Sequence, residues 1–180
     1  FEEQNIEVET VNVGTMSVRG CIACGSCYKT GKCAIDDIVN ELAPKLESAD
    51  GLVVASPVYY ASANATIIAV LDRLFYSTRF PKTMKVGAAI ATARRGGITA
   101  TFDQLNKYFL INQMPIISGR YWNMVHGSKA EDVIKDEEGL QTMRNIGKNM
   151  AWLIKCINAG KDAGIGTPVA DKGARTSFIR

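Results

Sequence analysis

The chain of 180 residues is 47% hydrophobic and 22% charged, a composition typical of a globular protein with one buried core. It has no apolar run of about eighteen residues, so the sequence predicts no membrane-spanning helix and no membrane partner. The net charge of +3 comes from 21 basic and 18 acidic side chains spread along the chain, which argues against a nucleic-acid-binding surface.

The first residues bear on the cellular compartment. Residues 1–13 lack the basic start and apolar stretch of a secretory signal. We therefore expect a cytoplasmic, reducing environment, which argues against reading the cysteines as disulfides.

The first half of the chain predicts two strands and one helix. Residues 6–13 alternate apolar with polar side chains and are rich in β-branched types, so they predict a strand. Apolar residues then recur at helical spacing between residues 38 and 46, after two aspartates that can cap a helix. Pro44 is expected to kink or divide this helix. Residues 51–56 form a continuous apolar run, typical of a parallel strand covered on both faces.

The second half continues the alternation. Helices are predicted over residues 62–76, 98–112 and 138–159, strands over 85–91 and 115–118, and irregular structure over 120–137. Cys156 is expected in the core. Alternating strands and helices predict an α/β fold with an open, doubly wound parallel sheet. We expect one domain over residues 1–160, with residues 21–33 inserted as a loop, and a C-terminal tail over 161–180.

Four of the five cysteines lie within thirteen residues, as Cys21, Cys24, Cys27 and Cys33. Thiolates gathered this closely predict a soft metal centre or a reactive redox patch. The last gap of five residues differs from the ferredoxin run C-x2-C-x2-C-x3-C-P, and structural zinc sites join two pairs of ligands across a longer stretch. An iron–sulfur cluster and unliganded thiols both stay open as interpretations.

Two loops follow predicted strands and should lie at the carboxyl edge of the sheet, where open α/β folds bind ligands. They comprise residues 56–60 and 92–97. The cysteine loop also follows a predicted strand, so we expect it at the same edge. His126 is the only histidine, and a lone loop histidine is more often structural than catalytic.

These motifs together resemble a known family. Ser56-Pro57-Val58-Tyr59-Tyr60 after an apolar strand, with Leu71-Asp72-Arg73 about one helix later, is similar to the NAD(P)H-dependent FMN reductase branch of the flavodoxin-like fold. The cysteine segment, the loop Arg94-Arg95-Gly96-Gly97 and residues 121–124 with His126 extend the resemblance to the iron-sulfur flavoproteins of anaerobic prokaryotes. The resemblance covers residues 6 to about 160.

The resemblance implies FMN as cofactor, with its ring between the two loops. The residues implied as FMN contacts are Ser56, Pro57, Val58, Tyr59 and Tyr60 in the first loop, and Thr92, Ala93, Arg94, Arg95, Gly96 and Gly97 in the second. Backbone N–H groups would bond the ring, the tyrosines would cover its face, and an arginine would stabilise negative charge on the reduced flavin. Cluster-bearing members imply a [4Fe–4S] centre on Cys21, Cys24, Cys27 and Cys33, NAD(P)H as a possible donor, and a homodimer or homotetramer.

A flavodoxin-like sheet has a central first strand and a phosphate-binding loop, and this chain begins at what should be the second strand. We therefore expect a longer natural chain that holds the FMN phosphate contacts. Three functions stay open. The first is an oxidoreductase that passes electrons between a nicotinamide or reduced carrier and an acceptor, through the cluster. The second is a cluster-free reductase of quinones or nitroaromatics, and the third is a non-enzymatic metal-binding regulatory module.

Overall fold

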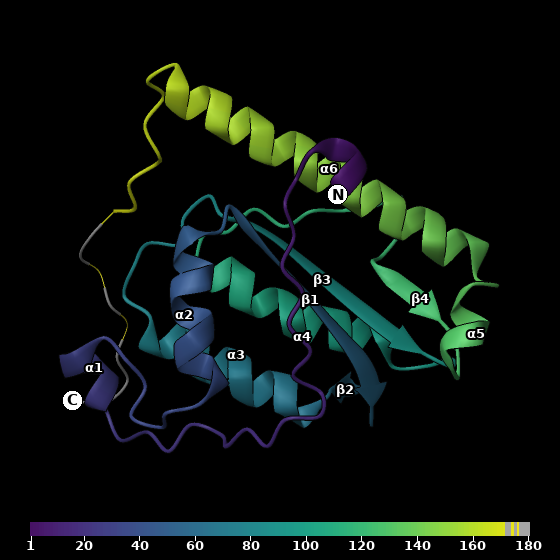
Figure 1. Ribbon diagram of the computed structural model, residues 1–180, viewed down its shortest axis with the longest axis horizontal. Coiled ribbons are helices and arrows are strands. Elements are labelled where there is room, and N and C mark those ends of the chain that lie inside the picture. Colours follow the sequence, from purple (N-terminus) through teal and green to yellow (C-terminus); the bar gives the residue numbers. More distant parts are fainter. Residues whose placement is uncertain (172–173, 175, 177–180) are drawn as a thin grey trace.

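The computed structural model describes residues 1–171, 174 and 176. Its sheet is built on two parallel strands, β1 (Gly51–Tyr59) and β3 (Val86–Ala93). The short strand β2 (Ser62–Ala63) pairs antiparallel with the end of β1, and β4 (Met124–His126) pairs parallel with the end of β3. The order β2-β1-β3-β4 is an open, mainly parallel sheet (Figure 1), which confirms the predicted α/β fold class.

The helices connect and cover these strands. Helix α3 (Ala65–Ser77) leads from β2 toward β3, α4 (Ile98–Ile111) follows β3, and α2 (Ile38–Ser48) precedes β1. The long helix α6 (Glu137–Asp162) follows β4. Three short helical turns complete the described elements: η1 (Glu2–Gln4), α1 (Ser26–Thr30) and α5 (Ala130–Val133). No helix in the described part of the chain is both long and apolar enough to cross a membrane.

Successive residues of β3 enter different cores, because side chains alternate across a strand. Ala89 packs with Leu105 and Phe109 of α4, which lies behind the two long strands in Figure 1. Ala88 packs instead with Ile146 and Met150 of α6. Strand β3 is therefore covered on both faces, as its apolar sequence predicts.

Strand β1 is covered on one face only, so the prediction of two covered faces is wrong. Val54 and Ser56 are buried, whereas Val53 and Ala55, which alternate with them along the strand, are exposed. The physical reason is the position of α6, which packs against β3 and β4 rather than over β1.

Two other predicted strands are not formed. Residues 6–13 pair with no strand among the described residues; Val13 packs instead into the core of α2 and α3, with Val39 and Val70. The predicted strand over residues 115–118 is reduced to a single bridge between Gly87 and Ile116 near the start of β3, and β4 pairs with the end of that strand.

Several helix predictions also need correction in detail. Pro44 lies inside a continuous α2 and does not divide it. Cys156 is exposed, because it lies on the opposite side of α6 from the buried Ile154. Helix α6 continues to Asp162, and residues 165–171 of the predicted tail have neither helix nor strand. The apolar tail residues Phe178 and Ile179 lie outside the described residues.

An ion pair joins α2 to α3. Arg73 of α3 is 1% exposed, and its Nη1 and Nη2 donate to the two carboxylate oxygens of Asp37 at 2.6 and 2.8 Å. Asp37 is also the N-cap of α2, because its Oδ1 accepts from the backbone N–H of Val39 at 3.1 Å. The Arg73 guanidinium holds the pKa of this carboxyl below its ordinary value. A buried cation therefore depends on one carboxylate.

Removing that carboxylate should destabilise the fold. Asp37→Asn keeps an amide oxygen that can cap α2 but leaves the Arg73 charge buried, so we expect a loss of about 3 kcal/mol in the free energy of unfolding. Urea unfolding measures the change. Asp36→Asn is the matched control, because the exposed Asp36 pairs with the exposed Lys32 and should leave the urea midpoint almost unchanged. Equal urea midpoints for the two variants would contradict the assignment of the Arg73–Asp37 ion pair as a stabilising contact.

The same pair predicts a dependence on pH. Because the folded pKa of Asp37 is lowered, its stabilisation is complete above its unfolded pKa of about 3.9 and is lost as the pH falls through the folded value. The difference in unfolding free energy between the wild type and Asp37→Asn should be constant above about pH 5 and should shrink below about pH 4. A difference that grows on acidification would contradict this prediction.

Candidate functional site

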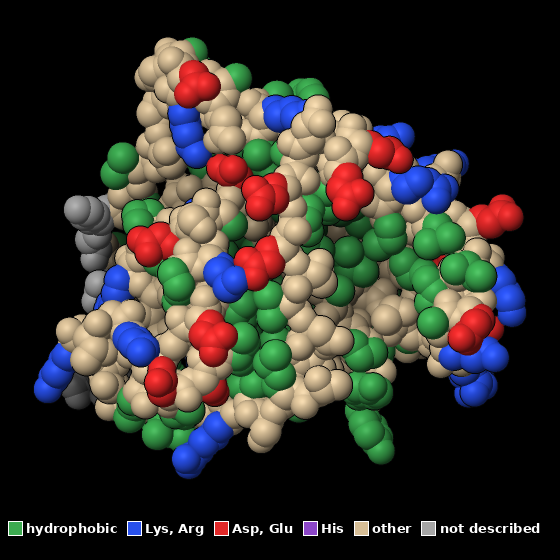
Figure 2. Space-filling model, in the orientation of Figure 1, with side chains coloured by type: hydrophobic (Ala, Val, Ile, Leu, Met, Phe, Trp, Pro, Cys, Tyr) green, Lys and Arg blue, Asp and Glu red, His purple; other side chains and the backbone are tan. Residues whose placement is uncertain are grey.

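The first predicted FMN loop is not a loop but the end of β1 and a tight hairpin turn. Strand β1 runs through Tyr59, and Tyr60 and Ala61 turn the chain into β2 with φ values of 52° and 57°. A two-residue hairpin with two positive φ values matches the twist of its strands. Figure 2 shows hydrophobic side chains projecting at this hairpin, where Tyr59 and Tyr60 are exposed. Two aromatic rings are therefore available to cover a planar ligand.

Buried polar contacts fix the shape of this hairpin. The Ser56 hydroxyl is 2% exposed, donates to the Pro57 carbonyl and accepts from the Asn64 backbone N–H, both at 2.8 Å. From α4, Gln104 Oε1 accepts from the Ser62 hydroxyl at 2.8 Å and from the Ala63 N–H at 3.0 Å. The sequence interpretation gave Ser56 a ligand contact, whereas its side-chain hydrogen bonds here are within the protein. Gln104 and Asn64 were not predicted; Asn64 stands at the N-cap position of α3, a local signal that could have found it, whereas no local pattern marks Gln104.

The second predicted loop lies against the first. Gly97 has φ +92°, and a Cβ atom there would lie 2.9 Å from both Ala61 Cα and Val58 Cγ1. Only glycine allows this approach without strain. Thr92 and Ala93 end β3 half-buried, and Arg94, Arg95 and Gly96 are exposed. The structure thus brings the two predicted loops together at the carboxyl ends of β1 and β3.

His126 lies beside the second loop, because β4 pairs it with Ala93. Its backbone N–H donates to Asp136 Oδ2 at 2.7 Å, and its Nδ1 lies 3.4 Å from the same oxygen. Asp136 also caps α6 by accepting from the Gly139 N–H at 2.9 Å. Burial raises the pKa of Asp136, but the hydrogen bonds from Gly139 and His126 outweigh it and hold that pKa below its ordinary value. Asp136 is therefore an ionised acceptor beside His126, and the sequence analysis did not predict this contact.

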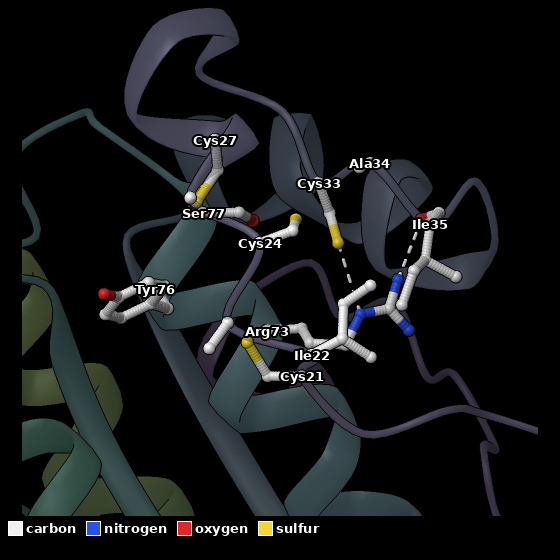
Figure 3. A pocket seen from close by; sticks show the side chains of 12 residues that line it. Cys21, Ile22, Cys24, Cys27, Cys33, Ala34, Ile35, Arg73, Tyr76 and Ser77 are labelled. Carbon is white, nitrogen blue, oxygen red and sulfur yellow. Dashed lines mark hydrogen bonds between the residues drawn. The ribbon is translucent and has the colours of Figure 1, made fainter.

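The four clustered cysteines line one pocket (Figure 3), together with side chains from the last turn of α3 that include Arg73 and Tyr76. All four are free thiols; Cys27 is buried, Cys33 is half-buried, and Cys21 and Cys24 are exposed. Left-handed turns at Ala23, Gly25 and Gly31 flank the short helix α1 and fold the segment back on itself. The predicted gathering of the four thiols is therefore present in the fold.

The donor set of this pocket suits an iron–sulfur cluster. Among the described residues, no three cysteine, histidine or acidic side chains are arranged to hold a single metal ion. The pocket also supplies an N–H donor, because Arg73 Nε donates to Cys33 Sγ at 3.3 Å. Four thiols with an N–H donor match the ligation and second shell of such clusters.

The cysteine pocket does not lie beside the two strand-end loops, so the expectation of a common edge is wrong. It packs at the end of α3, whereas the hairpin precedes the start of that helix. Helix α3 rises about 16 Å between Ala65 and Tyr76, at 1.5 Å per residue. The two candidate sites of one chain are therefore about one helix apart.

Comparisons with known proteins found a matching family and similar relatives. The family described as NADPH-dependent FMN reductase matches residues 1–129. An iron-sulfur flavoprotein of Methanocaldococcus jannaschii is 34% identical over 163 residues, covering 86% of this chain and 84% of the relative. An iron-sulfur flavoprotein of Methanosarcina thermophila is 30% identical over 166 residues, covering 89% and 85%.

The fold has a matching solved structure. The crystal structure of RosB with bound 8-demethyl-8-formylriboflavin-5'-phosphate superposes with a TM-score of 0.64 at 16% identity, covering 99% of this chain and 82% of that one. At that identity the likeness concerns the fold alone.

The close approach at Gly97 generates a test. Gly97→Ala adds a Cβ in a left-handed conformation against Ala61 and Val58, so we expect a loss of about 1–2 kcal/mol in stability and a displaced loop. Affinity for FMN, measured by fluorescence titration, should fall about tenfold, which corresponds to 1.4 kcal/mol. Gly96→Ala is the control, because its Cβ would meet nothing within 4 Å. Equal FMN affinities for the two variants would contradict a role of this contact in the site.

Proposed function

Because this chain belongs to the NADPH-dependent FMN reductase family, we propose that it is an FMN-dependent oxidoreductase with a [4Fe–4S] cluster on Cys21, Cys24, Cys27 and Cys33. It would pass electrons between a nicotinamide or reduced carrier and an acceptor through that cluster. The observation that carries the proposal is the single pocket lined by four free thiols, on a chain with a flavin-family fold.

The strand ends are the proposed FMN site. Bound FMN would supply the redox chemistry, accepting electrons singly or in pairs. Backbone N–H groups of the hairpin from Val58 to Tyr60 and of residues 92–97 would hold the ring, since the Gly97 approach brings these segments together. The exposed rings of Tyr59 and Tyr60 would cover its face. Arg94 and Arg95, exposed at the same edge, would stabilise negative charge on reduced FMN.

The cysteine pocket is the proposed cluster site. The relatives from Methanocaldococcus jannaschii and Methanosarcina thermophila carry the name iron-sulfur flavoprotein, and we extend that cofactor to this chain. The pocket offers thiols without competing carboxylates, and α3 supplies the N–H donor to Cys33. Free thiols of this kind fit the reducing cytoplasm that we propose as the location.

The separation of the two sites supports an assembly of more than one chain. Within one chain, the cysteine pocket and the flavin loops lie at opposite ends of α3, which rises about 16 Å between Ala65 and Tyr76. A second subunit that packs on the exposed Tyr59 and Tyr60 would exclude water from the flavin edge and bring a cluster of one chain toward the flavin of another. We therefore propose a homodimer or homotetramer, served by small-molecule or protein redox partners.

A cluster-free reductase of quinones or nitroaromatics is the second candidate. The observation in its favour is the exposure of Cys21 and Cys24, which would allow the thiols to stay unliganded. In that case NAD(P)H would reduce FMN directly, and the strand-end site alone would carry the activity. The metal-binding regulatory module has no described feature in its favour.

Spectroscopy of the full-length, anaerobically purified protein separates these functions. We expect flavin bands together with broad iron–sulfur absorption, and iron and sulfide in near-equal amounts. Cys24→Ser should lose iron and sulfide but keep FMN, because Cys24 lines the pocket and not the strand-end site. Cys156→Ser, which removes an exposed thiol on α6, should keep both cofactors. Flavin without iron in the wild type would support the second candidate instead.

A further inference from the structure

We propose that Arg73 is a positioning residue that sets the reduction potential of the cluster, by donating its Nε–H to the Cys33 sulfur. The inference rests on the cluster of the proposed function and goes beyond it, because it distinguishes one of the four ligands from the other three.

The guanidinium of Arg73 has no freedom to turn. Its Nη1 donates to the Arg19 carbonyl at 3.0 Å and to Asp37 Oδ2 at 2.6 Å, and its Nη2 donates to the Ile35 carbonyl and to Asp37 Oδ1, both at 2.8 Å. These four contacts occupy four of its five N–H groups and fix its plane. The fifth donor, Nε–H, is directed at Cys33 Sγ at 3.3 Å. Figure 3 shows this contact beside the bond to Ile35.

Cys33 is held from the other side as well. Its backbone N–H donates to Asn40 Oδ1, and its carbonyl accepts from Asn40 Nδ2, both at 3.1 Å. Asn40 belongs to α2, so Cys33 is fixed between α2 and α3. Cys21 and Cys24 are exposed on the free part of the loop. Cys33 is therefore held between two helices and accepts a hydrogen bond from a charged donor.

A hydrogen bond to a ligating sulfur withdraws electron density from it and favours the reduced, more negative cluster. Arg73 is 1% exposed, so water does not screen the bond. The charge of Arg73 is balanced by Asp37, which limits the effect of net charge. The directed N–H···S bond, rather than a positive charge, is therefore the part of Arg73 that should raise the potential.

Three variants separate the bond from charge and from structure. Arg73→Met with Asp37→Asn removes the N–H···S bond and both charges, and so keeps the local net charge at zero. Asp37→Asn alone keeps the N–H···S bond but weakens the contacts that hold the Arg73 guanidinium in place. Lys29→Gln removes an exposed positive charge from α1 that makes no bond to Cys33. The readout is the midpoint potential of the cluster, from a mediated redox titration of the loaded protein followed by EPR, with iron counted in each sample.

In the double variant, the ratio of reduced to oxidised cluster at a fixed potential should fall about tenfold, which is 59 mV toward negative potential for a one-electron couple. Asp37→Asn should show no negative shift, since it leaves the bond and unmasks a positive charge. The midpoint potential of the cluster in Lys29→Gln should shift little, because exposed charges are screened. If the double variant does not fold, Arg73→Lys gives the same test, because lysine keeps the charge but has no N–H at the Nε position.

Two results would overturn the inference. One is a wild-type potential in the double variant, or in Arg73→Lys where that variant replaces it. The other is an equal negative shift in Asp37→Asn, which would mean that Arg73 only holds the loop. A wild-type protein that binds FMN but no iron would overturn the cluster of the proposed function itself. The iron content therefore tells the two failures apart.

Discussion

One buried guanidinium determines where the cysteine segment can lie. Arg73 projects from α3 and binds the chain before the cysteines at Arg19 and after them at Ile35 and Asp37. A buried charge is costly unless every donor is paired, and here all five N–H groups have acceptors. Between these anchors only Cys27 is buried. Both ends of the loop are thus fixed by hydrogen bonds, while its middle has little core of its own.

Helix α3 connects the two candidate sites, because residues at each of its ends contact one of them. At its start, Asn64 caps the helix through its side chain, and its backbone N–H donates to the Ser56 hydroxyl of the hairpin. At its end, Arg73 and Tyr76 line the cysteine pocket. Between them, Leu71 packs toward α4, and Val70 and Leu74 pack toward α2. Because packed cores resist deformation, the distance between the sites is a fixed property of one chain.

The sequence predicted the elements that depend on local periodicity, and it missed the contacts that join distant residues. Strand β3 and helices α4 and α6 were predicted, because their apolar residues bury against neighbours at regular spacing. The strand over residues 6–13 was wrong, because an alternating pattern needs a partner strand and none of the described residues provides one. The hairpin turn at Tyr60 and Ala61 lacks the Asn-Gly or Asp-Gly signal that would reveal it.

In the candidate sites, too, features of the local sequence were predicted and contacts between distant residues were not. The clustering of four cysteines in sequence predicted a shared centre, and the left-handed turns at Ala23, Gly25 and Gly31 fold the segment so that the four thiols line one pocket. Arg73 and Cys33 are forty residues apart, and Gln104 meets Ser62 across forty-two, so no spacing rule could pair them. The assignment of residues 56–60 and 92–97 to FMN stays a prediction, although the close approach at Gly97 makes these segments neighbours.

The distance between the sites has a consequence for how electrons would enter and leave. Under the proposed function, a partner that docks at the cysteine pocket would contact α1 and the end of α3, whereas a small molecule that reacts with the flavin would reach the hairpin and residues 92–97. The two surfaces share no residue. Under the proposed function, α3 would keep the two cofactors of one chain apart, and subunit packing would shorten the path between the cofactors of different chains.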